Sequence, residues 1–132
     1  MNLSDPEFIA MFAELSEQIY QNAIDKDFYG PDQAMAKALA GMKLGRAWEE
    51  SRDALRLDLI HSELSEALEA IRHGNPPDQH CPEFSGLEIE LADAVIRIMD
   101  LAAHRKLRLA EAILAKHEHN KSRPRMHGGK RF

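Results

Sequence analysis

The sequence predicts an all-α protein: a single domain, residues 1–132, forming an antiparallel helical bundle with a metal site between two central helices. Three observations lead to this class. Apolar residues recur at spacings of three and four along most of the chain, and no segment alternates with the period of a strand. Two of the periodic segments each carry a pair of acidic residues one helical turn apart. The length of 132 residues suffices for one hydrophobic core without disulfides.

Composition excludes several classes of protein. The only cysteine is Cys81, so neither an intrachain disulfide nor a cysteine-rich zinc site is possible. The first residues, MNLSDPEFIAMFAEL, lack the basic flank and long apolar run of a signal peptide, and no apolar stretch approaches about 20 residues. We therefore expect a protein of the reducing cytoplasm that neither crosses nor binds a membrane.

The charge of the chain is divided unequally along its length. The formal net charge is −5, but residues 116–132 hold six basic side chains against one acidic one, so residues 1–115 carry −10. An acidic body disfavours general binding of nucleic acid, whereas a short basic tail suits a small polyanion.

The first predicted helix begins at Ser4, where Glu7 allows a capping box or Asp5 acts as the cap, with Pro6 in the first turn. It continues to about Ala23 or Lys26 through the apolar positions Phe8, Phe12, Leu15, Ile19 and Ala23. Gly30-Pro31 then predicts a turn and a break.

Residues 33–50 favour helix by composition, but Gly41 and Gly45 each cost roughly 1 kcal/mol relative to alanine, so one unbroken helix is not expected. Their role is left open. Trp48, the only tryptophan, is either a half-buried packing residue or a surface that stacks a base. Phe28 and Tyr29 likewise either cover the core or contact a ligand.

A sharper helical pattern covers residues 51–73. Its apolar stripe has Glu63 at the edge and Glu66 further round, which predicts that both carboxylates are half-buried. Gly74 followed by Pro76-Pro77 ends the helix, and residues 75–84 form a loop. The members of the stripe are Leu57, Ile60, Leu64, Ala67, Leu68 and Ile71.

The next helix begins with a capping box at Ser85 and Glu88. It is apolar on two sides, so a chain this short needs a second subunit to cover it, and we expect at least a homodimer, either a dimer or a tetramer. Glu90, Asp93 and Arg97 cluster on one flank. A last helix is expected from about Leu107 to His119.

Four acidic residues, Glu63, Glu66, Glu90 and Asp93, then converge. The 23 residues between Glu66 and Glu90 suffice for an antiparallel hairpin that brings both pairs to one level. Converging carboxylates repel one another unless a hard divalent cation neutralises them, with Mg²⁺ the first choice and Mn²⁺ the second. A di-iron site is the poorer interpretation, because no histidine follows a glutamate by three residues.

Magnesium sites with few carboxylates usually act on substrate phosphates. Lys116, Asn120 and Arg123, followed by a His-Gly-Gly-Lys run that ends at Lys130, supply cations and backbone N–H groups for phosphate oxygens. The alternative for this tail is a solvated terminus without a function.

Three runs of the sequence together resemble the MazG-like nucleotide pyrophosphohydrolases of the all-α NTP pyrophosphatase superfamily. They are LIHSELSEALEAIRHG at 59–74, EIELADAVIRIMDLA at 88–102 and KHEHNKSRPRMHGGKRF at 116–132. The resemblance covers most of residues 51–132, whereas the segment 33–50 departs from the short linker of simpler members.

The resemblance implies Mg²⁺-dependent hydrolysis of a nucleoside triphosphate to the monophosphate and pyrophosphate, in the service of nucleotide-pool house-cleaning. It implies that Glu63, Glu66, Glu90 and Asp93 hold the metal, with Glu63 and Glu66 catalytic and Glu63 favoured as the group that orders or deprotonates the water. A set of residues would bind the substrate, in part from the partner subunit: Lys116, Asn120, Arg123, Lys130 and Trp48.

Two other functions remain as alternatives. One is a catalytically idle helical dimer that binds a nucleotide or a protein partner, although four intact carboxylates argue against it. The other is a nucleic-acid-binding protein that uses the basic tail, which the acidic body disfavours.

Overall fold

The computed structural model describes residues 4–123 and confirms the all-α class. The chain forms α1 (Asp5–Asp25), α2 (Gly30–Ala40), α3 (Gly45–Arg72), α4 (Gly86–His104) and α5 (Leu109–Lys121). Within residues 4–123 no strand forms, and the one β-bridge is an isolated pairing of Pro77 with Ser85. None of the helices in this range combines the length and the apolar composition needed to cross a membrane.

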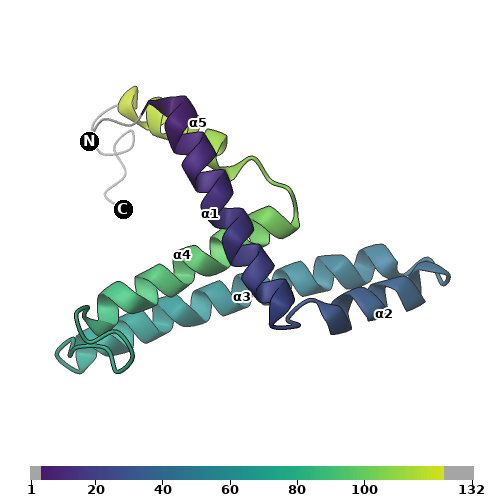
Figure 1. Ribbon diagram of the computed structural model, residues 1–132, viewed down its shortest axis with the longest axis horizontal. Helices are drawn as coiled ribbons and strands as arrows, with labels where there is room; N and C mark the ends of the chain where they lie inside the picture. The colour runs from purple at the N-terminus through teal and green to yellow at the C-terminus, as the bar shows by residue number, and fades with distance from the viewer. Residues whose placement is uncertain (1–3, 124–132) are drawn as a thin grey trace.

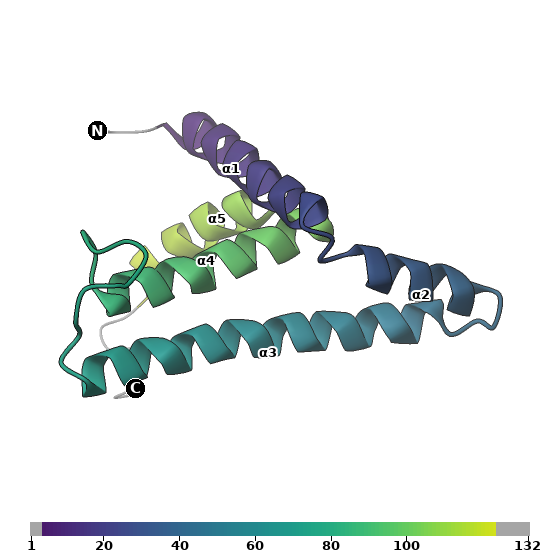
Figure 2. The same cartoon turned by 60° about the horizontal axis from the view of Figure 1, so that its bottom comes forward.

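The helices are arranged around the pair α3 and α4, which lie side by side and run in opposite directions (Figures 1 and 2). Helix α1 crosses α4, and α2 packs against the first half of α3. Helix α5 packs against α1. The predicted hairpin of two central helices is therefore present, and α1 covers part of one side of it.

Both predicted capping boxes are present. The Ser4 hydroxyl accepts from the Glu7 backbone N–H, while the Glu7 carboxylate accepts from the Ser4 N–H at 2.8 Å. Ser85 and Glu88 make the same reciprocal pair at the start of α4. Each pair satisfies backbone donors that a helix start otherwise leaves unpaired. The starts of α1 and α4 are therefore determined by local sequence.

The segment 33–50 is not one helix, in agreement with its two glycines. Helix α2 begins at Gly30, with Pro31 in its first turn, so the predicted break falls before Gly30 rather than after it. The chain then turns through Lys43, whose φ is 58°, before α3 begins at Gly45. Helix α3 is therefore six residues longer at its start than the predicted 51–73. Helix α5 also lies two residues later than predicted.

The predicted apolar stripe of α3 is only partly buried. Ile60 and Ala67 are buried, whereas four other members of the stripe are about half exposed in the isolated chain: Leu57, Leu64, Leu68 and Ile71. Helix α4 likewise exposes Leu91, Val95 and Ile98. The described part of one chain thus leaves a large apolar surface on its central pair of helices, which is unusual for a monomer.

Two glycines should respond to alanine in opposite ways. Gly74 has a φ of +82°, where a Cβ is strained, so Gly74→Ala should destabilise the protein by about 1–2 kcal/mol. Gly41 has helical dihedrals and open space around the added Cβ, so Gly41→Ala should stabilise by about 0.4–1 kcal/mol. Urea denaturation of both variants measures the two changes in the free energy of unfolding. A change of the same sign and size in both variants would contradict the positive φ at Gly74.

Candidate metal centre

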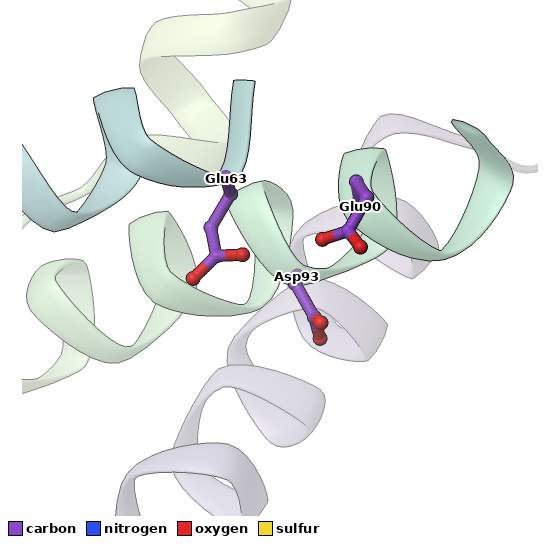
Figure 3. Close-up of side chains that lie close together, drawn as sticks. All are labelled: Glu63, Glu90 and Asp93. Atoms are coloured by element: carbon purple, nitrogen blue, oxygen red, sulfur yellow. The ribbon is translucent and has the colours of Figure 1, made fainter. Parts of the chain in front are cut away.

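The central pair of helices brings three carboxylates together. Glu63 comes from α3, and Glu90 and Asp93 come from consecutive turns of α4; one oxygen from each lies within 4.8 Å of the others. Figure 3 shows the Glu63 and Glu90 side chains directed toward each other across the two helices, with Asp93 beside them. The antiparallel hairpin therefore places these acids at one level, as the connector length predicts.

The fourth predicted ligand, Glu66, lies outside this group of three. Its side chain is exposed, so the expectation that Glu63 and Glu66 are both half-buried is wrong: Glu63 is 6% exposed and Glu66 faces solvent. The difference arises because α4 covers only the Glu63 side of α3. Glu66 remains close enough to Glu90 for its charge to act on that carboxyl, and its role as a ligand stays a prediction.

Arg97 is the cation of this cluster. Its guanidinium Nε donates to the Glu63 carboxylate, and the Arg97 side chain keeps 43% exposure while that of Glu63 keeps 8%. Arg97 lies one helical turn after Asp93 on α4. Arg97, Asp93 and Glu63 therefore share one side of the interface between α3 and α4. A buried carboxylate needs such a partner when no other cation is bound.

The two carboxyls of α4, Glu90 and Asp93, have pKa values above their ordinary range. Burial, followed by the charges of Glu66, Glu63 and Asp93, raises the pKa of Glu90. Burial and the charge of Glu63 likewise raise the pKa of Asp93, and Arg97 partly offsets this. Both groups are therefore held in an environment that disfavours their ionised form, which a bound cation would reverse.

The donor set fits a hard divalent cation. All three groups offer oxygen, the ligand that Mg²⁺ and Mn²⁺ prefer over nitrogen or sulfur. Two oxygens on opposite sides of one Mg²⁺ lie about 4 Å apart, so separations of up to 4.8 Å close by small side-chain rotations. Three carboxylates leave further coordination positions for water or phosphate oxygens.

A cavity of about 430 Å³ adjoins the carboxylates. Glu63, Asp93 and Arg97 contribute to its wall, and the rest of the wall comes from α1, the start of α2, and the parts of α3 and α4 further from the loop 75–84. Apolar side chains line much of it: Ile19, Ala23, Leu55, Leu59 and Ile96. The carboxylate cluster therefore adjoins a space large enough for an organic group.

A polar network at this cavity was not predicted from the sequence. The Tyr29 hydroxyl donates to Asp100 Oδ2 at 2.7 Å, and the Arg56 guanidinium lies 4.8 Å from the centre of the Tyr29 ring. Arg56 also donates to Asp32 at 3.0 Å. One signal was present in the sequence: Asp100 follows Asp93 by seven residues, which places both on one face of a helix.

The structure places the three candidate stacking aromatics, Trp48, Phe28 and Tyr29, differently. Trp48 lies between α2 and α3, where its indole N–H donates to the Asp32 carbonyl oxygen at 3.1 Å. It borders a separate pocket of about 50 Å³, not the cavity of about 430 Å³ beside the carboxylates. Phe28 and Tyr29 both border the cavity of about 430 Å³, but Tyr29 is 3% exposed whereas Phe28 is 71% exposed. Phe28 is therefore the best placed of the three to meet a ligand.

The predicted phosphate-binding residues lie away from the carboxylates of their own chain. Lys116 and Asn120 border a shallow pocket on α5, and Arg123 is exposed just beyond that helix. No residue of α5 contributes to the wall of the cavity of about 430 Å³ beside the carboxylates. Lys130 and the Gly-Gly run before it lie outside the described residues. These assignments stay predictions.

Comparison of the chain with protein-family models, curated proteins and solved structures gives no match.

Proposed function

We propose that this protein is a Mg²⁺-dependent nucleoside triphosphate pyrophosphohydrolase that cleaves ribo- or deoxynucleoside triphosphates into the monophosphate and pyrophosphate. The observation that carries the proposal is the convergence of Glu63, Glu90 and Asp93 from two helices beside a cavity that Glu63 and Asp93 line. The sequence resemblance supplies the reaction. Removal of unwanted nucleotides from the pool is the corresponding biological role.

The role of each residue in this proposal follows from the position of its side chain. Glu63 and the two α4 carboxylates would hold Mg²⁺, with Glu66 turning in from the surface. When bound, Mg²⁺ would supply charge screening for the phosphates and polarise the attacked phosphorus. One carboxylate orders the attacking water, and Glu63 is our choice for this role. Arg97, released from Glu63 in part, faces the cavity and can donate to a phosphate oxygen.

A homodimer is part of the proposal for two reasons. One chain leaves an apolar surface exposed, and it does not bring its phosphate-binding residues to its own carboxylates. The exposed apolar side chains of α3 and α4 provide a surface that a second copy would cover. The residues Lys116, Asn120 and Arg123 then come from the partner subunit, since α5 of the same chain packs against α1 instead.

Separation of products from a panel of nucleoside triphosphates tests the reaction. Purified protein should convert at least one ribo- or deoxynucleotide, canonical or damaged, into monophosphate and pyrophosphate with Mg²⁺, and EDTA should abolish the conversion. Turnover that survives EDTA would remove the metal from the proposal. Absence of turnover across the panel, with nucleotide binding retained, would favour the idle dimer.

Metal binding should depend on pH in a definite direction. The folded-state pKa values of Glu90 and Asp93 are raised above the ordinary values of 4.5 for Glu and 3.8 for Asp. At pH values just above these ordinary pKa values, the folded protein therefore holds more protons than the unfolded chain. The metal-free protein therefore loses stability as pH rises through this range, and these protons compete with Mg²⁺. Titration calorimetry with Mg²⁺ in two buffers of different ionisation enthalpy should show more proton release at about pH 5 than at about pH 8. Equal proton release at both values would contradict the assignment.

A further inference from the structure

Arg97 belongs both to the carboxylate cluster and to the wall of the cavity of about 430 Å³. Its guanidinium Nε donates to the Glu63 carboxylate, and Arg97, Glu63 and Asp93 all line that cavity. The charge of Arg97 also acts on Asp93, whose ionised form it favours. The guanidinium therefore already neutralises part of the negative charge that would attract Mg²⁺ to these carboxylates.

A guanidinium and a metal ion at the same carboxylate oppose each other. The Glu63 side chain is 8% exposed, so its carboxylate is largely removed from water and its interactions with other charges are weakly screened. A guanidinium in hydrogen-bond contact with Glu63 repels a cation held by the same carboxylate, whether or not the hydrogen bond is kept. The protein consequently binds Mg²⁺ alone more weakly than it would without the charge of Arg97.

A bound phosphate would offer Arg97 another anionic partner. The Arg97 side chain keeps 43% exposure against 8% for Glu63, so the arginine is the member of this pair that has room to move. It lines the cavity, and a guanidinium holds phosphate oxygens through two parallel N–H groups. When Arg97 pairs with a phosphate there, it no longer neutralises Glu63.

We propose that Arg97 couples the binding of Mg²⁺ to the binding of the nucleotide. While the cavity holds no phosphate, Arg97 pairs with Glu63 and weakens metal binding; with a substrate bound, it transfers to a phosphate oxygen. The inference rests on the proposed function for the position of the phosphates. Such coupling is reciprocal, so the metal and the nucleotide strengthen each other's binding by the same factor.

Calorimetry with Mg²⁺ alone tests the first half of this coupling. Arg97→Gln removes the positive charge but keeps an N–H donor for Glu63, which limits the loss of stability. This variant should bind Mg²⁺ at least about fivefold more tightly than the wild type, the lower end of the range for coupled sites. Arg97→Lys keeps the charge and should bind Mg²⁺ as the wild type does. The matched control is Arg46→Gln, the same change at an exposed position of α3 outside the cavity wall, and it should have no effect.

Calorimetry with a nucleotide at saturating Mg²⁺ tests the second half. The probe is an α,β-methylene analogue of a nucleoside triphosphate, which cannot be cleaved between the α- and β-phosphorus, chosen for its affinity for the wild type. Arg97→Gln should bind this analogue at least about fivefold more weakly than the wild type. Arg97→Lys, which provides a single-point donor, should also bind it more weakly than the wild type and keeps the test valid if Arg97→Gln does not fold.

The opposite signs of the two changes identify the coupling, because a residue that only supports the fold would weaken both affinities when replaced. Unchanged or weaker binding of Mg²⁺ by Arg97→Gln overturns the inference. Unchanged binding of the analogue by both Arg97 variants overturns it as well.

Neither titration needs turnover, so this inference and the proposed reaction can fail separately. The two opposite changes in affinity, without hydrolysis of any triphosphate, would retain the role of Arg97 and remove the reaction. Mg²⁺-dependent hydrolysis by the wild type without the opposite changes would leave the reaction standing and remove the role of Arg97. No binding of Mg²⁺ by either the wild type or Arg97→Gln would contradict both.

Discussion

Glu90→Gln should abolish turnover of nucleoside triphosphates, by at least about a hundredfold, without lowering the stability of the metal-free protein. The side chain belongs to the group of three carboxylates, and its raised pKa shows that its negative charge is unfavourable in the folded state. A neutral amide of the same shape removes a metal ligand and also removes this repulsion. The loss of activity should therefore come with an unchanged or higher Tm.

Thermal unfolding with and without Mg²⁺ gives the second readout for this variant. Mg²⁺ at about a hundred times its dissociation constant should stabilise the wild-type protein by about 2.7 kcal/mol, and Glu90→Gln should lose this stabilisation. Glu50→Gln is the matched control, since Glu50 is an exposed partner of Arg46 on α3 and should change stability by less than about 0.5 kcal/mol. Full activity in Glu90→Gln would exclude the carboxylate cluster as the metal site.

Two inactive variants should restore activity when they are combined in one dimer. The first is Glu90→Gln, and the second replaces both Lys116 and Arg123 by alanine. If α5 of one subunit serves the carboxylates of the other, a mixed dimer has one site with both parts intact. Co-refolding at equal concentration makes half of the dimers mixed, so the recovered activity should be about a quarter of the wild-type value.

The control for this experiment combines Glu90→Gln with Asp93→Asn, two lesions of the same carboxylate cluster. No mixed dimer of that pair contains an intact site, so activity should stay at the background of the single variants. Absence of recovery in the first mixture, with mixed dimers shown by native mass spectrometry, would place the phosphate-binding residues in the same chain as the carboxylates.

Local signals in the sequence predicted much of the fold. The capping boxes at Ser4 and Ser85 and the glycine at 74 are short-range features, and each appears in the structure where the sequence predicts it. The spacing of Glu63 and Glu90 along a hairpin is also nearly local, because the connector between them determines the level at which the helices meet. Three of the four predicted acids consequently come together.

Features that depend on which helix covers which face were not predictable in the same way. Glu66 lies one turn from Glu63, but α4 covers one and leaves the other in solvent, which periodicity within α3 alone does not reveal. The pairing of Tyr29 with Asp100 joins residues 71 positions apart and depends on how α1 and α2 meet α4. Trp48 illustrates the same point, since its hydrogen bond to the Asp32 backbone follows from the packing of α2 on α3.

The most direct test of the proposed reaction is ³¹P NMR of the products formed in ¹⁸O-labelled water with Mg²⁺, using the best substrate of the panel. Attack of water at the α-phosphorus predicts one ¹⁸O atom in the nucleoside monophosphate and none in the pyrophosphate, with no reaction after addition of EDTA. Label in the pyrophosphate would place the attack at the β-phosphorus instead. Release of diphosphate and inorganic phosphate, or a reaction that continues in EDTA, would contradict a metal-dependent pyrophosphohydrolase that acts through Glu63, Glu90 and Asp93.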